Sequence, residues 1–152
     1  MVKIKKFQTL LKQYVRVAVD ASIFIYQFEQ HPQFEPLCSV LFDGISTRQL
    51  QLTTSTITVS EVMIKPVQLS DTEVVTLYEG VFTGLPNFTL LDVDYVIAKL
   101  AAYIRAHYRI LLPNAIHIAS ALQAKADVFI TNDEQLKTIR EIKVICLKDY
   151  VS

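Results

Sequence analysis

Acidic side chains follow two apolar, β-branched stretches of the chain. VRVAV (residues 15–19) ends on Asp20, and ADVFIT (residues 126–131) is followed by Asn132 and Asp133. In open parallel sheets, functional side chains gather at the carboxyl ends of the strands. Because Asp is also common at helix starts, each aspartate taken alone is better explained as a cap or loop residue. Only the two together indicate a candidate acidic site.

A third acid, Glu61, lies inside the apolar helical pattern ITVSEVMI (residues 57–64). A carboxylate is costly to bury without a partner, so its place among apolar neighbours suggests a functional role. A solvent-facing glutamate is the alternative.

LLPNAIHIAS (residues 111–120) opens a helical pattern at Pro113, with Asn114, His117 and Ser120 at steps of three. Asn is a good helix N-cap, so Asn114 has a structural interpretation as well as a place in a possible site. His117 could lie on the same helix face, but we expect it to pack rather than to take part in chemistry.

Several other kinds of site are excluded by the sequence. It contains neither G-x-x-x-x-G-K-[ST] nor G-x-G-x-x-G, so a P-loop or dinucleotide fingerprint is absent. A haloacid-dehalogenase-type phosphatase would need a second Asp where Ser22 stands. His31, His107 and His117 lack a two-histidine metal spacing, and no Ser-His-Asp elbow is visible.

Strand-like and helix-like segments alternate along the chain. Strands are predicted at 15–19, 50–55, 88–93, 126–131 and 142–147. Helices are predicted after Asp20, over 32–47, from 56–58 to a stop at Pro66, from a capping box at 70–73 to about 82, over 95–108, from Pro113 and over 132–139. Because the strands are apolar throughout instead of alternating, the pattern predicts a three-layer α/β/α sandwich on a mainly parallel sheet.

The 152 residues predict a single domain, residues 1–152, in which residues 1–14 form a basic helical extension. A content of 51% hydrophobic and 20% charged residues argues against disorder. No apolar run approaches the ~20 residues of a membrane helix, and no secretory signal is apparent, so we expect a cytoplasmic protein without membrane contact. Cys38 and Cys146 lack metal or redox spacing and are expected to be buried thiols.

Fifteen Lys and Arg balance fifteen Asp and Glu, but the cations are unevenly distributed. The first sixteen residues contain five of them (Lys3, Lys5, Lys6, Lys12 and Arg16) and no acid. This segment could help to hold a polyanion, although five cations are few for that purpose and a solvated helix face is the simpler explanation.

Four segments, taken in order, resemble the motifs of PIN domains, especially the VapC-like group. They are VAVDASIFIY, TVSEVM, LLPNAIHIASAL and ADVFITNDEQL, and the resemblance covers roughly residues 15–147. It implies an α/β/α nuclease that cuts RNA with Mg²⁺ or Mn²⁺ held by acidic side chains. It also implies that a cognate antitoxin protein and a homodimer are to be expected as partners.

The resemblance assigns roles by position. Asp20, Glu61 and Asp133 match the metal-binding, catalytic acids, Ser22 matches a small hydroxyl residue, and Thr131 and Asn132 match supporting polar residues. On this basis we expect a metal-dependent endoribonuclease acting on single-stranded RNA, as in the toxin of a type II toxin-antitoxin pair.

Asn114 stands where the family usually has an aspartate as the fourth acid. An amide oxygen can bind a cation, so the resemblance makes Asn114 a compromised fourth catalytic and metal-binding residue, which has no formal charge and cannot act as a base. A unit charge about 4 Å from another is worth about 4 kcal/mol at an effective dielectric constant near 20, so metal binding should weaken. Asn114 thus leaves three explanations open: a weakened nuclease site, a site that has lost catalysis, or a position altered from the natural sequence.

Two alternatives to a working nuclease follow. One is a catalytically silent PIN module that binds RNA or a protein partner without cleavage. The other is a receiver-like domain that uses Asp20 or Asp133 as phosphoacceptor, although the sequence lacks the paired acids that such a domain needs after its first strand.

Overall fold

A single five-stranded sheet, in which every neighbouring pair of strands is parallel, forms the centre of the protein. The computed structural model describes all residues, 1–152. The strands are β1 (Arg16–Val19), β2 (Gln51–Ser55), β3 (Phe88–Leu91), β4 (Val128–Thr131) and β5 (Lys143–Cys146), in the spatial order β3-β2-β1-β4-β5.

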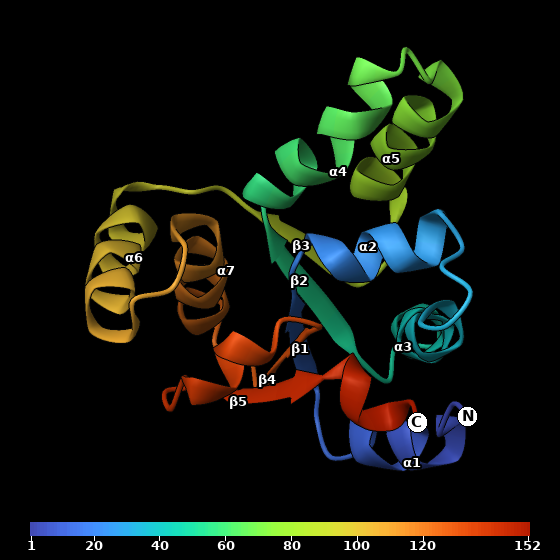
Figure 1. Ribbon diagram of the computed structural model, residues 1–152, viewed down its shortest axis with the longest axis horizontal. Helices are drawn as coiled ribbons and strands as arrows, with labels where there is room; N and C mark the ends of the chain where they lie inside the picture. Colours follow the sequence, from blue (N-terminus) through green and yellow to red (C-terminus); the bar gives the residue numbers. More distant parts are fainter.

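Seven α-helices and two 3₁₀ helices surround the sheet. They are α1 (Ile4–Leu11), α2 (Ala21–Phe28), α3 (Glu35–Ser46), α4 (Ile57–Gln68), α5 (Thr72–Gly84), α6 (Tyr95–Tyr108), α7 (Leu112–Gln123), η1 (Glu134–Thr138) and η2 (Leu147–Tyr150). Figure 1 shows α6 and α7 on one face of the sheet, α2 and α3 on the other, and the α4–α5 hairpin projecting beyond it. The predicted three-layer α/β/α architecture is confirmed.

Each face of the sheet has its own apolar core. Val17, Val19 and Ile130 point into the larger core, which includes side chains of α1 to α5. Ala18, between Val17 and Val19, and Phe129, next to Ile130, point into the smaller core beneath α6 and α7. Successive side chains of a strand point to opposite faces, so β1 and β4, which are covered on both sides, have apolar residues at consecutive positions. This explains the uninterrupted apolar strands of the sequence.

The order of the strands reverses beside β1. After β1 the chain adds β2 and β3 on one side, and then crosses to add β4 and β5 on the other. Val19 pairs in register with Ile130, so Asp20 and Thr131 leave the sheet at the same level. In open α/β sheets such a reversal opens a crevice at the carboxyl ends of the strands, and ligands bind there.

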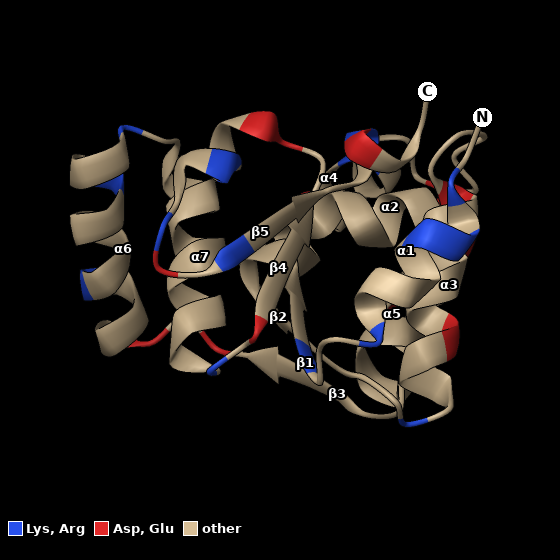
Figure 2. Cartoon of the chain, turned by 90° about the horizontal axis from the view of Figure 1, so that it is seen from below, with Lys and Arg blue, Asp and Glu red and all other residues tan.

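The N-terminal helix α1 packs against the body of the protein. Phe7 and Leu11 are buried in the larger core, and Val2 pairs with Val151 next to the C-terminus. The lysines of α1 lie on its outer side and form a blue patch in Figure 2. The N-terminal segment therefore has a packing role, whatever else it does.

Some local predictions were wrong. Helix α4 does not stop at Pro66 but continues to Gln68, since this proline removes only one N–H near the end of the helix and Leu69 still bonds to Lys65. Helix α5 is capped by Asp71 alone rather than by a capping box, and residues 134–138 form a 3₁₀ helix instead of an α-helix.

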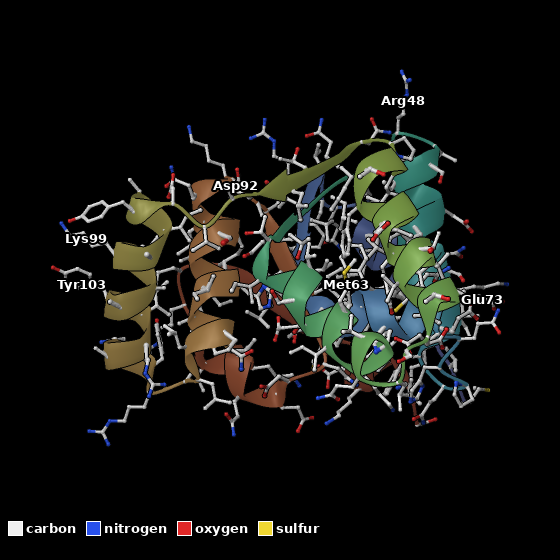
Figure 3. All side chains as sticks on the ribbon, turned by 90° about the horizontal axis from the view of Figure 1, so that it is seen from above. Arg48, Met63, Glu73, Asp92, Lys99 and Tyr103 are labelled. Atoms are coloured by element: carbon white, nitrogen blue, oxygen red, sulfur yellow. The ribbon has the colours of Figure 1, made fainter.

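Other predictions about residue environments can be compared directly with the structure. Cys38 and Cys146 are both buried free thiols, as predicted. No helix has the length and apolar character needed to cross a membrane. In Figure 3, Lys99 and Tyr103 project outward from α6, whereas Met63 points inward from α4 toward the larger core.

Asp127 links the start of β1 to the start of β4, and the contribution of this link to stability can be measured. Its Oδ2 accepts hydrogen bonds from the backbone N–H groups of Val15 (2.9 Å) and Arg16 (2.8 Å), and these bonds lower the pKa of the Asp127 carboxyl. We expect Asp127→Ala to lower the free energy of unfolding by about 1 kcal/mol at pH 7.

The pH dependence of this effect follows from the lowered pKa. The stabilisation is complete above the unfolded-state pKa of about 3.9 and is lost as the pH falls through the lower folded-state value. Urea denaturation at several pH values should therefore show the two proteins converging in acid. Asp92→Ala, at an exposed aspartate without a hydrogen-bond partner, is the control. Equal losses from both substitutions at pH 7 would contradict the expectation.

Candidate active site

A cavity of about 560 Å³ opens at the carboxyl ends of β1 and β4, where the strand order reverses. Its lining includes six of the seven predicted site residues: Asp20, Ser22, Glu61, Asn114, Asn132 and Asp133. The seventh, Thr131, is buried beneath the cavity floor and bonds to Asp20. A larger hollow of about 710 Å³ between α1 and α3 contains none of them. The structure thus gathers the predicted residues in one place.

Asp20 lies at the floor of this cavity and is only 8% exposed. It caps α2 by accepting the N–H of Ser22 (3.1 Å), and it also accepts the hydroxyls of Ser22 (2.5 Å) and Thr131 (2.5 Å). Burial raises the pKa of the Asp20 carboxyl, and these hydrogen bonds offset part of that rise. A cation at the mouth of the cavity would favour the ionised form further.

Asp133 lies beside Asp20 on the next strand and has a similar local role. Its Oδ1 accepts the N–H of Gln135 (3.0 Å) and so caps η1. Its own N–H donates to Oγ1 of Thr131 (3.1 Å), the same hydroxyl that donates to Asp20. Thr131 therefore connects the two aspartates. Both acids are caps and cavity residues at once, so the two interpretations offered by the sequence are compatible.

Asn114 does not cap α7, so the cap interpretation of this residue is wrong. Helix α7 starts at Leu112, with Leu111 in the N-cap position, which makes Asn114 its third residue. Its Nδ2 instead donates a hydrogen bond to Oδ2 of Asp133 (3.0 Å). Where the resemblance led us to expect a fourth acid, the chain has a donor that binds one of the other three.

Glu61 faces the cavity from α4 and is paired with His117 of α7. His117 Nε2 lies 2.5 Å from Oε1 of Glu61, and the side chains are 1% and 34% exposed, respectively. Nδ1 of His117 is buried without a partner, so we assign the proton to Nε2, from which it is donated to the Glu61 carboxylate. The sequence led us to expect that His117 only packs, whereas it contacts a residue of the candidate site. The signal was its spacing, one helical turn after Asn114 on the same face.

Asn132, Tyr26 and Lys148 form the opposite wall of the cavity. The buried side chain of Asn132 donates to the Tyr26 hydroxyl (3.1 Å) and accepts the backbone N–H of Lys148 (3.0 Å). Neither Tyr26 nor Lys148 was predicted. The only signal for Lys148 was its place, two residues after the final strand, as Asp133 is two residues after β4.

The donor atoms of the cavity suit a hard divalent cation. Carboxylate and amide oxygens are the ligands that Mg²⁺ and similar ions prefer. No three Asp, Glu, His or Cys side chains lie close enough together to hold one metal ion as a ready-made cluster. An ion would therefore be bound by one or two carboxylates and by water, which is the usual coordination of Mg²⁺ in proteins.

Known structures resemble this fold over most of its length. One chain of DNA-bound VapBC from Salmonella typhimurium matches with a TM-score of 0.68 and 17% identity, covering 88% of this chain and 98% of that one. A chain of FitAcB from Neisseria gonorrhoeae matches with a TM-score of 0.65 and 19% identity, covering 87% and 98%.

A chain of a toxin-antitoxin complex from Klebsiella pneumoniae is similar as well, with a TM-score of 0.64 and 20% identity, covering 86% of this chain and 97% of that one. At these identities the likeness concerns the fold. Comparison with curated proteins finds no significant sequence match. A family model, described as the PIN domain, matches residues 17–142. The chain therefore belongs to the PIN domain family.

Proposed function

We propose that this protein is a metal-dependent endoribonuclease that cleaves single-stranded RNA, with activity weakened by Asn114. One observation carries the proposal. In a PIN domain, Asp20, Glu61 and Asp133 come from three separate segments of the chain to line one cavity at the point where the strand order reverses. Carboxylates gathered in this way can bind a divalent cation, which can in turn contact a phosphate.

Asp20 and Asp133 are the residues best placed to hold Mg²⁺ or Mn²⁺, and Glu61 would act on the ion through a bound water. A bound ion would supply a more acidic water and stabilise negative charge on the phosphate oxygens. The protein's contribution is to fix the acids. Ser22 and Thr131 orient Asp20, the N–H of Gln135 orients Asp133, and His117 orients Glu61.

Asn114 changes the electrostatics of the site rather than its shape. Its amide occupies one oxygen of Asp133 with a hydrogen bond, and it leaves the cavity one negative charge short of the family pattern. Both effects weaken the attraction for a divalent cation. We therefore expect binding of Mg²⁺ or Mn²⁺ that is measurable but weak.

The same proposal includes a protein partner, a cognate antitoxin, with this chain as the toxin of the pair. The structural neighbours support it, because several were solved as toxin-antitoxin or VapBC complexes. Exposed apolar side chains on the projecting α4–α5 hairpin also fit a protein contact, namely Ile64, Val67, Leu69 and Leu77. A homodimer is a further proposal, supported only by the family resemblance.

A silent PIN module that binds RNA or protein without cleavage is the second candidate. The observation that favours it is that every carboxylate of the trio already has a donor within the protein. Asp133 receives the Asn114 amide, Glu61 receives His117, and Asp20 receives two hydroxyls. Such a site is partly compensated without a metal ion.

Cleavage tests the leading proposal directly. The purified protein with Mn²⁺ or Mg²⁺ should cut single-stranded RNA, and the cleavage should stop when EDTA removes the metal ion. Asp20→Asn keeps the size of the side chain but removes its charge, so we expect the rate to fall roughly 100-fold or more. Asp92→Asn, an exposed site outside the cavity, should leave the rate unchanged. If no single-stranded RNA is cut, even by the Asn114→Asp variant, the proposal fails.

Asn114→Asp separates the two candidates. In EDTA this variant should unfold more easily, by about 1–2 kcal/mol in urea denaturation, because a carboxylate replaces the amide donor against Asp133. In calorimetric titration it should bind Mn²⁺ at least ~10-fold more tightly than the unaltered chain, since one charge is added to the site.

Asn114→Ala is the matched control, because it removes the donor without adding charge. It should lose some stability in EDTA, and it should gain much less affinity for Mn²⁺ than the Asp variant, because it frees one oxygen of Asp133 without adding a charge. Measurable Mn²⁺ binding by the unaltered chain supports the nuclease, whereas binding that occurs only in the Asp variant supports the silent module.

A further inference from the structure

Lys148 is the only Lys or Arg among the residues that line an otherwise acidic cavity. Four of the twelve lining residues are acids: Asp20, Glu61, Asp133 and Glu134. Lys148 is exposed and has no carboxylate within ion-pairing distance. Its neighbour Lys137, by contrast, is paired with Asp149 at 2.8 Å. The charge of Lys148 is therefore available to a ligand.

The backbone fixes where this charge sits. Strands β4 and β5 pair in register, Thr131 with Cys146, so Asp133 and Lys148 lie two residues beyond the same level of the sheet. The N–H of Lys148 donates to the buried side chain of Asn132, next to Asp133 in the chain. Asn132 is itself anchored to the Tyr26 hydroxyl. Lys148 is thus tied to the segment that carries a candidate metal ligand.

Along this edge of the sheet two acidic residues are followed by a basic one. Asp20 follows β1, Asp133 follows β4 and Lys148 follows β5, and these three strands are adjacent. A phosphodiester that approaches the two aspartates is repelled by them wherever no cation lies between. A lysine at the β5 end offers attraction to the same polyanion, because an ammonium group is a compact charge with three donors.

We propose that Lys148 is a phosphate-positioning residue for single-stranded RNA. Its ammonium group binds a non-bridging oxygen of one phosphate, which directs the adjoining part of the strand over Asp20 and Asp133. The strand then runs across the β5 side of the cavity. This inference rests on the proposed function, since it assigns the contact that orients the substrate of that same site.

An internal role for Lys148, as a counter-ion of the cavity acids, is the competing explanation. It predicts a different response to substitution. Removing a counter-ion makes the cavity more negative and tightens the binding of Mn²⁺, without a specific effect on the contact with RNA. Removing a phosphate contact weakens the binding of RNA and changes its salt dependence.

The test measures RNA binding separately from cleavage. A fluorescein-labelled pool of single-stranded RNA with random sequence is titrated with protein in EDTA, and the affinity is followed by fluorescence anisotropy over a series of NaCl concentrations. For Lys148→Gln, we expect affinity about three- to tenfold weaker near 0.1 M salt and a log–log salt slope that is smaller by about 0.7, the value for one phosphate contact on a single strand.

Lys143→Gln is the matched control. Lys143 is exposed at the opposite end of the same strand, β5, and its substitution changes the net charge equally. It should keep the slope of the unaltered chain. Lys148→Arg should keep it as well, since it retains the cation. The hydrogen bond to Asn132 involves the backbone of residue 148, so all variants retain it, and thermal unfolding checks their folding.

Three results would overturn the inference, and they differ in what else they affect. Equal salt slopes for Lys148→Gln and Lys143→Gln would show that Lys148 makes no phosphate contact. In that case, Mn²⁺-dependent cleavage by the unaltered chain would still support the proposed nuclease. Unchanged RNA binding together with tighter Mn²⁺ binding in Lys148→Gln would identify a counter-ion instead. If the unaltered chain binds no RNA in EDTA, the inference fails, whereas the proposed function is decided separately by the Mn²⁺-dependent cleavage assay.

Discussion

Asp20, a residue only 8% exposed, lies at the junction of β1, β4 and α2, where burial alone disfavours the charge of its carboxylate. Three hydrogen-bond donors compensate for this burial: the N–H and hydroxyl of Ser22 from the first turn of α2, and the hydroxyl of Thr131 from the neighbouring strand. The contact with Thr131 requires β1 and β4 to be adjacent and in register, as the pairing of Val19 with Ile130 makes them. The hydrogen bonding of Asp20 at the end of β1 therefore depends on the position of β4 in the sheet.

The rest of the site is built outward from this junction. Thr131 also accepts the N–H of Asp133, which fixes the second carboxylate relative to the first. Helix α7 begins beside it and directs Asn114 to Asp133, and one turn later His117 reaches across to Glu61 on α4. Because α7 also supplies Ile118 and Ala119 to the smaller core, its position is set by apolar packing. The geometry of the two polar contacts thus depends on a well-packed helix and not on a loop.

How far the sequence could predict this arrangement differs from residue to residue. Asp20 and Asp133 could be placed at one edge because apolar strands imply a parallel sheet, and such a sheet gathers the ends of its strands. The bond of Asn114 could not be predicted, since an amide near a helix start fits a cap equally well, and only the approach of α7 to η1 decides between them. The pairing of His117 with Glu61 depends on how α4 packs against α7. Lys148 was overlooked because its relation to Asp133 requires the register of β4 with β5, which no pattern within either strand encodes.

The polarity of the cavity follows from these contacts taken together. On the α4 and α7 side, His117 and Asn114 each direct an N–H at a carboxylate, so a cation that binds there competes with hydrogen bonds already made. Asp20 differs, because its donors lie below it and on the adjoining turn, and burial still raises its pKa. Asp20 is the most buried of the three acids, so a cation held there would do most to favour the ionised form, and Lys148, which has no carboxylate partner, follows a strand two positions away in the sheet. An anion that bridges a cation held at Asp20 and the ammonium of Lys148 would satisfy both, and an extended polyanion with regularly spaced phosphates is the kind of ligand that can do so.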